Sequence, residues 1–348
     1  MAEMTRPDAV HLVGSIGLDT VEEVFRTVGK TLGPYLRRAP DGEVGGRKLW
    51  ISWQYPLLRA SVFLKPDPSG AERPTNKFSL LTLADGVKPQ DVHFGELGYA
   101  REARASYLDF IAARDRGELP KGIRFQVSLP TPFAVVSSVV VAEALAAVEG
   151  AYEQAMIAEV AALCRHIPHQ DLCIQWDLCN EMIIWDGQRT DGVPYADQPR
   201  EGILQRLQRL SGGIPADVEI GVHLCYGDFA GRHFVEPKSA AKMVEFANAL
   251  AQAIAHKLAY VLMPVPIDRT DDAFYEPLRG LKLAPGTELY LGLVHAKDGV
   301  QGTKTRVDMA RRYAPPFGIA TECGMARARS EELVRNLLTI HADICSGI

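Results

Sequence analysis

The sequence contains no apolar run that approaches the ~20 residues of a membrane-spanning helix. Its first residues, MAEMTRPDAV, lack the charged-then-apolar pattern of a secretory signal. It has no long block of lysine or arginine and a formal net charge of −5, so we expect neither nucleic acid nor a membrane as partner. The six cysteines lack the spacing of a disulfide framework. These absences predict a reduced, cytoplasmic protein.

What is present is an alternation of apolar, strand-like runs with amphipathic, helix-like stretches, the pattern of βαβ units. Parallel strands buried on both faces read as continuous apolar runs. Eight segments fit: 9–17, 37–47, 122–133, 171–181, 217–229, 258–266, 287–296 and 317–327. A TIM barrel needs ~250 residues plus insertions. The sequence therefore predicts one α/β domain over residues 1–348, a single (β/α)8 TIM barrel, with a long insertion at about 56–97 after the second strand.

Polar residues interrupt the carboxyl ends of several predicted strands, which is where TIM-barrel active sites lie. These residues are Ser15, Asp41, Glu43, Asp177, Glu181, His223, Cys225, His295, Glu322 and Cys323. Strands that converge on one mouth bring such residues together even when they are far apart in the sequence. The sequence therefore predicts a site built from several strand ends.

The stretch GVHLCYGDF holds His223 and Cys225 two residues apart in a strand-like run. Positions i and i+2 of a strand face the same side, so both side chains project together. A buried histidine and a buried cysteine also occur as ordinary packing residues. Cys323 ends another predicted strand, and the glycine after it permits a sharp turn. One histidine and two cysteines form a soft ligand set that favours Zn²⁺, and three ligands with an open position are typical of catalytic zinc.

The other four cysteines have a different setting. Cys164 and Cys345 fall on predicted helices, and Cys173 begins its strand rather than ending it. Cys179 follows Asp177 closely and is the least clear of the four. We interpret all four as packing residues.

With these motifs in view, the sequence resembles the cobalamin-independent methionine synthases, within the superfamily that also holds the uroporphyrinogen decarboxylases. GVHLCYGDF and IATECGMAR are similar to the two zinc motifs of that family, H-x-C-Y and P-D-C-G-L. HLVGSIG, PDGE, IQWDLCNE and LGLVHAKDG resemble further family segments in the same order. The resemblance covers essentially the whole chain but only the catalytic C-terminal half of the long synthases.

The resemblance implies a TIM barrel and a zinc-dependent transfer of a methyl group to a thiol. By it, His223, Cys225 and Cys323 are zinc ligands and His295 is the proton shuttle. Ser15, Glu43 and Asp177 hold the amino-acid end of the thiol acceptor, and Glu181 and Trp176, which flank Asp177, join them as candidate substrate-binding residues.

The sequence departs from the family at two positions. The family's fourth zinc ligand is a glutamate on the strand after H-x-C, whereas the corresponding run, LAYVLMPVPIDRTDD, has none. Met263 and Pro264 occupy that region, Asp268 is the nearest carboxylate, and Glu322 should face away from Cys323 because adjacent strand residues alternate. The folate-using enzymes also carry a tryptophan where this chain has Phe133. A three-ligand site is the simplest reading, and Fe²⁺ is the alternative metal.

Aromatic residues appear instead just past Glu43, in LWISWQYP. Helical spacing favours core packing for Trp50 and Trp53. If they line the mouth, the substrate is flat and apolar. Arg47 nearby is a candidate partner for a substrate carboxylate or an ordinary solvated arginine.

The leading prediction is a zinc-dependent methyl or alkyl transferase that takes a thiol acceptor and a small methyl or alkyl donor. The epoxyalkane:coenzyme M transferases resemble a related solution on the same barrel. A second reading keeps the barrel but gives it a redox metal such as Fe²⁺, or a lyase or decarboxylase activity on a small, possibly aromatic, substrate. A third is a degenerate barrel that binds a thiol or a metal without catalysis. The presence of the acid–base catalytic candidates His295, Glu43 and Asp177 at separate strand ends argues against it. No oligomeric state is predicted.

Overall fold

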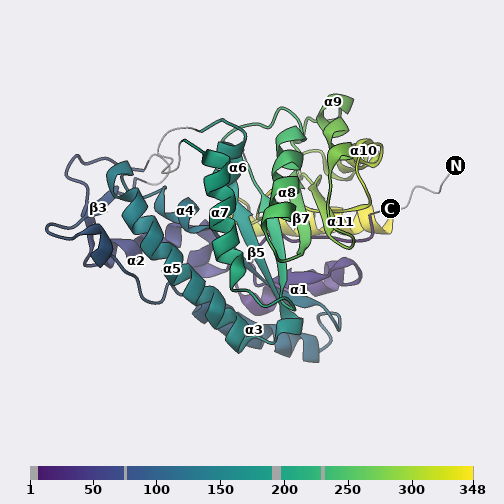
Figure 1. Ribbon diagram of the computed structural model, residues 1–348. Helices are drawn as coiled ribbons and strands as arrows, with labels where there is room; N and C mark the ends of the chain where they lie inside the picture. The colour runs from purple at the N-terminus through teal and green to yellow at the C-terminus, as the bar shows by residue number, and fades with distance from the viewer. Residues whose placement is uncertain (1–6, 74–76, 190–196, 229–231, 348) are drawn as a thin grey trace.

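The computed structural model describes residues 7–73, 77–189, 197–228 and 232–347. Its centre is a parallel sheet in the order β1-β4-β5-β6-β7-β8-β9 (Figure 1). The strands are Arg38–Pro40 (β1), Arg124–Pro130 (β4), Leu172–Leu178 (β5), Glu219–Leu224 (β6), Leu258–Pro264 (β7), Glu288–Gly292 (β8) and Phe317–Ile319 (β9). Each strand pairs in parallel with the next one along the chain, apart from the small hairpin β2–β3. The expected α/β class with a parallel sheet is confirmed.

Residues 9–17 lie between the two edges of this sheet without forming a regular strand. Val10 makes parallel bridges to Leu36, just before β1, and to Ile319 in β9. Ser15 and Ile16 make further parallel bridges, to Gly42 and Met325. These contacts are single bridges and not a continuous ladder, so the first of the eight predicted strands is present as an irregular segment. The sheet of the described residues has seven regular strands, curled so that an irregular segment reaches both edges, as in TIM-barrel-like folds.

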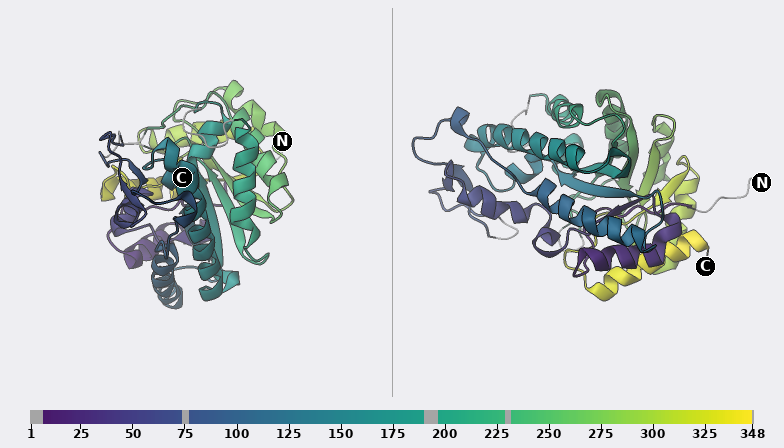
Figure 2. Two further views of the ribbon diagram at one scale, coloured as in Figure 1. Left: turned by 60° about the vertical axis from the view of Figure 1, so that its left-hand side comes forward. Right: turned by 90° about the horizontal axis from the view of Figure 1, so that it is seen from below.

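Helices follow the strands and pack outside the sheet (Figures 1 and 2). They are Val21–Leu32 (α1), Tyr55–Ala60 (α2), Tyr99–Asp115 (α3), Pro132–Val136 (α4), Ala142–His166 (α5), Cys179–Trp185 (α6), Pro199–Gly212 (α7), Ala241–Ala253 (α8), Asp272–Tyr275 (α9), Gly299–Arg311 (α10) and Glu331–Ser346 (α11). The first and last helices, α1 and α11, lie side by side (Figure 2). This contact joins the beginning and the end of the chain.

Helix α1 shows why these segments are helical. The side chain of Thr20 accepts a hydrogen bond from the backbone of Glu23, which caps the first turn. Glutamates in that turn complement the helix dipole. The apolar residues recur every three or four positions and are buried: Val24, Phe25, Val28 and Leu32.

Between β1 and α3 the chain makes an excursion that covers residues 56–97, the segment predicted as an insertion. It contains α2 and an antiparallel hairpin of Leu64–Pro66 (β2) and Leu81–Leu83 (β3). The hairpin lies on the side of the molecule away from α10 and α11 (Figure 1). Short 3-10 turns, Gly45–Leu49 and Ser52–Gln54, connect β1 to this excursion and, as shown below, carry one wall of the site.

Among the described residues, every helix is too short or too polar to cross a lipid bilayer. This agrees with the lack of a long apolar run in the sequence.

Candidate metal centre

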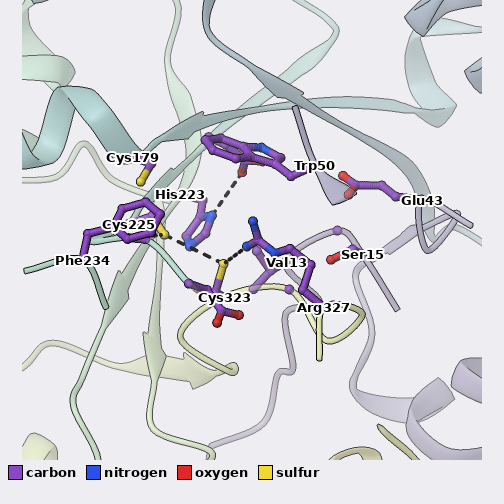
Figure 3. Close-up of a pocket in the computed structure, with 15 residues that line it drawn as sticks. Val13, Ser15, Glu43, Trp50, Cys179, His223, Cys225, Phe234, Cys323 and Arg327 are labelled. Atoms are coloured by element: carbon purple, nitrogen blue, oxygen red, sulfur yellow. Dashed lines mark hydrogen bonds and ion pairs between the residues drawn. The ribbon is translucent and has the colours of Figure 1, made fainter. Parts of the chain in front are cut away.

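The candidate site lies where β5, β6 and β9 end at the same edge of the sheet (Figure 3). Asp177 in β5 and His223 in β6 are directly paired in the strand register. Cys225 follows β6 at once, and Cys323 comes four residues after β9. Their side chains line a pocket that encloses about 440 Å³ of empty space, some of it open to solvent. This is room for a small molecule.

His223, Cys225 and Cys323 each aim one ligand atom at a common point, with all three atoms within 4.8 Å of one another. The two Sγ atoms are 3.9 Å apart. Two thiolates on a tetrahedral zinc ion with bonds of about 2.3 Å lie about 3.8 Å apart. The donor set and the spacing of its two sulfur atoms therefore fit Zn²⁺.

The orientation of His223 is set by Asp177. Its Nδ1 donates to the Asp177 carboxylate at 3.1 Å, which leaves Nε2, now 3.0 Å from the carbonyl oxygen of Glu322, as the nitrogen available to a metal. Burial by itself lowers the pKa of His223, but the hydrogen bond to Asp177 and its charge outweigh this effect and raise it. A carboxylate behind a ligating histidine fixes its tautomer and increases its basicity.

Asp177 is itself held by Gln175, two residues earlier on the same face of β5. The Gln175 amide donates to Asp177 at 2.8 Å and to the carbonyl of Val13 at 2.6 Å. Its carbonyl accepts from the Tyr260 hydroxyl and pairs with His11, both at 2.8 Å. This fully buried network makes the Asp177–His223 pair rigid.

The two thiols are held in the protonated form while no metal is bound. Contact with the neighbouring thiol of Cys179, together with burial, raises the pKa of Cys225. Contact with Cys225 and burial likewise raise the pKa of Cys323. The backbone N–H of Gly227 points at the Cys225 sulfur at 3.2 Å. Because a metal ligand must be the thiolate, metal binding at this site would release protons.

Ser15 and Glu43 form the wall of the pocket opposite Cys225 (Figure 3). Burial, then the charges of Asp177 and Asp41, raise the pKa of Glu43 to about 8. Glu43 also has a positive φ of 48°, a conformation that non-glycine residues adopt at a cost of about 1–3 kcal/mol. The wall thus concentrates acidic groups suited to a substrate ammonium.

Gly324 is needed for close approach and not for the sharp turn that the sequence suggested. Its φ is not in the left-handed region. A Cβ at this position would lie 2.1 Å from Ser15 Oγ, so only glycine allows the segment after Cys323 to pass this serine. Gly227, by contrast, has a φ of 91° and would meet the Phe234 ring at 2.2 Å.

His295 does not line this pocket. It lies three residues past the end of β8 and lines a second, larger cavity of about 1720 Å³, much of it open to solvent. Its Nε2 donates to the carbonyl of Val265 at 2.9 Å, which is the bonding of an ordinary structural histidine. Its Nδ1 faces the Glu322 carboxyl at 3.5 Å. Burial, with the nearby guanidinium of Arg306, lowers the pKa of His295 to about 4.

The two cavities share Gly227, Asp228 and Cys323, and Glu322 lines the second of them. Glu322 and Cys323 lie past the end of β9, so the expected strand alternation does not apply to them. The carboxyl of Glu322 lies between His295 and His233. Burial, then the charge of Glu236, raise its pKa. A protonated Glu322 is thus placed to pass a proton to the unprotonated Nδ1 of His295, 3.5 Å away.

Three predicted substrate residues lie outside the pocket. Trp176 is fully buried in the core, because alternation in β5 turns it away from the face of Asp177. Glu181 is buried in α6, where Thr131 donates to it. Arg47 forms an ion pair with Asp41 at 2.8 Å and lines a separate small cavity that also touches Glu43.

The sequence left open whether the aromatic residues after Glu43 line the site or pack in the core, and the structure shows the place of each. Trp50 lines the pocket, and its backbone has a positive φ of 55°. Trp53 packs edge-on against Tyr99, and Tyr55 stacks on Phe78 in the excursion. Only Trp50 of these residues belongs to the site.

No fourth protein ligand joins the three among the residues that the structure describes. Met263 is buried, and Asp268 lines the second cavity. Cys179 lines the pocket beside Cys225 but lies outside the group of three. An open position for a substrate or water is what remains.

Sequence reasoning missed Arg327 and Phe234 and undervalued Cys179, all of which line the pocket. Arg327 stands in the quoted motif IATECGMAR, four residues after Cys323, so its nearness to a predicted ligand was the available signal. No local pattern marks Phe234.

Comparison with known proteins finds likeness in structure alone. No family model and no curated protein matches the sequence. The structure matches a B12-independent methionine synthase from Shewanella sp. W3-18-1, in complex with selenomethionine, with a TM-score of 0.58, 13% identity and coverage of 99% of this chain and 98% of that one. The chain shares the fold of that synthase.

Two further solved structures agree. A putative vitamin-B12 independent methionine synthase from Listeria monocytogenes matches with a TM-score of 0.59, 12% identity and the same coverage. A methyltransferase from Methanosarcina mazei matches with a TM-score of 0.51, 11% identity and coverage of 96% and 94%. The resemblance read from the motifs is thus confirmed at the level of the fold, over nearly the whole of each chain.

Replacing Glu43 by glutamine should change how stability depends on pH. The folded carboxyl keeps its proton up to about pH 8, whereas its usual pKa is 4.5. Between these values the unfolded state binds fewer protons, so wild-type stability falls as pH rises through this window. Glutamine does not titrate. We expect the melting temperature of Glu43→Gln to exceed that of the wild type, and the difference to widen from pH 5 to pH 8. Each kcal/mol of difference in the free energy of unfolding should shift the melting temperature by about 2–4 °C.

Calorimetric scans of both proteins across that range measure this difference. An offset that is the same at every pH would show that Glu43 is already ionised at pH 5.

Proposed function

We propose that this protein is a zinc-dependent methyl or alkyl transferase of the methionine-synthase type, with a thiol as acceptor. The observation that carries the proposal is the convergence of His223, Cys225 and Cys323, from segments 98 residues apart, within 4.8 Å in one pocket. The fold shared with methionine synthases and a methyltransferase supports it.

A bound zinc ion would supply a site at which the substrate thiol is held as a thiolate, a good nucleophile at neutral pH. The chain's own residues would do the rest. Asp177 orients His223 through Nδ1, and Ser15, Glu43 and Asp177 would bind the polar end of the acceptor. His295 lines the second cavity, which shares Cys323 with the metal pocket, and from there it would pass a proton to the leaving group of the donor. Since its pKa is low, the protonated Glu322 beside it is the source we propose.

Metal content is the first test. Protein purified without added metal should contain about one zinc ion per chain, and X-ray absorption should find two sulfur ligands. Addition of a substrate thiol should raise this number to three. A protein without metal, or a count that stays at two with every thiol tried, would refute the proposal.

We expect methyltetrahydrofolate to be a poor methyl donor. Phe133 stands where the folate-using enzymes carry a pterin-stacking tryptophan, and its ring is buried, 1% exposed, so a pterin finds no aromatic face there. The chain also lacks the family's glutamate ligand. Zinc-loaded protein incubated with homocysteine and methyltetrahydrofolate should form little methionine, as measured by mass spectrometry. Robust methionine formation would contradict this expectation.

One observation favours a second candidate function. Trp50 and Phe234 both line the pocket, as a flat, aromatic substrate would require. A lyase or decarboxylase, or an enzyme with Fe²⁺ at the same three ligands, would use such walls. Elemental analysis separates the redox version, because zinc supports no redox step: iron in place of zinc would favour it.

The remaining expectations are part of the same proposal. We propose that residues 1–348 form one domain with the excursion at 56–97 as its insertion, and that the protein works in the reducing cytoplasm. The six cysteines are all free, which suits a site whose thiolates must stay reduced.

A further inference from the structure

Arg327 is half-buried and, unlike the buried arginines Arg38 and Arg306, lacks a carboxylate partner among the described residues. Arg38 is paired with Glu219 and Glu288, and Arg306 with Asp298. Within the part of the chain that the structure describes, no carboxylate lies within ion-pair distance of Arg327, although its side chain lines the metal pocket. Even partial withdrawal of a guanidinium from water is costly when no counter-charge lies beside it.

The contacts that Arg327 makes hold the guanidinium in place and occupy few of its N–H donors. One terminal nitrogen points at Cys323 Sγ at 3.4 Å, and the guanidinium carbon lies 5.8 Å from the centre of the Trp50 ring (Figure 3). A guanidinium has five N–H donors in a planar fork that matches carboxylate and sulfonate groups. The donors not aimed at the sulfur are therefore available to an anion in the pocket.

Trp50 supports this interpretation independently. Its φ of 55° and ψ of −106° are unusual for any residue except glycine, and such strain is retained mainly where it positions a functional group. Here it keeps the indole in the pocket wall, where its ring lies beside the guanidinium. The ring and the cation attract each other at this distance.

We infer that Arg327 binds the anionic group of the thiol substrate, so that the substrate class is a short thiol with a terminal carboxylate or sulfonate. This inference rests on the proposed function. Because the guanidinium lies next to a metal ligand, the sulfur and the anionic group must be close, about two or three carbons apart given bonds of about 2.3 Å to the metal and about 2.8 Å to the guanidinium. Glu43 and Asp177, which line the same pocket, are the groups that would hold an additional ammonium.

The test compares two thiols that differ in charge and little else, 3-mercaptopropionate and 3-mercaptopropionamide. Binding of each to the zinc-loaded protein is measured by titration calorimetry at pH 7.5, with metal content checked in every preparation. We expect the carboxylate to bind at least about 10-fold more tightly, since a hydrogen bond to a charged group contributes about 1.5–3 kcal/mol. The carboxylate makes the thiol slightly less acidic, which works against this result. 2-Mercaptoethanesulfonate, as a third ligand, tells a sulfonate preference from a carboxylate preference.

Arg327→Gln should bring the ratio between the two thiols close to one, and Arg327→Lys, which keeps the charge but not the fork, should retain part of it. Arg73→Gln is the matched control: Arg73 is a half-buried cation whose charge is felt by Arg327, but it does not line the pocket. It should leave the ratio unchanged.

Equal binding of the two thiols by the wild type would overturn the inference and leave the proposed function standing. So would an unchanged ratio in Arg327→Gln, including the case in which only metal affinity falls, because Arg327 would then serve the Cys323 thiolate alone. Failure of every thiol to bind the zinc-loaded protein would overturn both the proposed function and this inference.

Discussion

Replacing Cys225 or Cys323 by serine is expected to remove most of the bound metal and leave the sheet folded. A hydroxyl is a far poorer ligand than a thiolate for a soft metal. Loss of a supporting residue behind a ligand already costs about 10–100-fold in metal affinity, so loss of a ligand should exceed about 100-fold. The fold should persist, because both residues follow their strands and serine is nearly isosteric with cysteine.

Metal per chain and the circular dichroism spectrum, measured on one preparation, test this expectation. Cys179→Ser is the matched control: Cys179 is buried in the same pocket, next to Cys225, but lies outside the group of three. It should keep its metal. Stoichiometric metal in Cys225→Ser or Cys323→Ser would remove that cysteine from the site, and loss of metal in Cys179→Ser would add it.

Replacing His295 by asparagine is expected to lower turnover by roughly 10²–10⁴-fold while metal content stays intact. Asparagine keeps the hydrogen bond to the Val265 carbonyl within reach, but it cannot take a proton from Glu322 and pass it on. The contacts of His295 with Val265 and Glu322 make this variant informative, because the first belongs to a structural role and the second to proton transfer.

Metal content, melting temperature and turnover separate the possible roles. Loss of metal would make His295 a ligand, and a lower melting temperature with unchanged turnover per folded molecule would make it structural. His341→Asn is a control for the loss of a buried imidazole: His341 is fully buried in α11, is bonded to the Leu337 carbonyl and lines neither cavity. It should lose stability and keep turnover.

Where a residue lies within a regular strand, its period of two was sufficient to predict which way it faces. That rule accounts for the shared face of Gln175 and Asp177, and it explains why Trp176 between them is buried in the core. It does not extend past a strand end. His295 lies in a loop after β8, so its orientation toward Val265 and the second cavity follows from loop packing, for which a sequence has no period.

The sequence by itself determined the class of the fold and the chemistry on offer. Alternating apolar runs require a parallel sheet with helices outside it, and a histidine with two cysteines can serve only a soft metal well. Only the tertiary structure decided which groups meet. The 3.9 Å between Cys225 and Cys323, the 3.5 Å between Glu322 and His295, and the contact of Arg327 with Trp50 all depend on segments far apart in the chain. Local periodicity records which face a residue occupies, whereas distances across the pocket arise from the packing of the whole sheet.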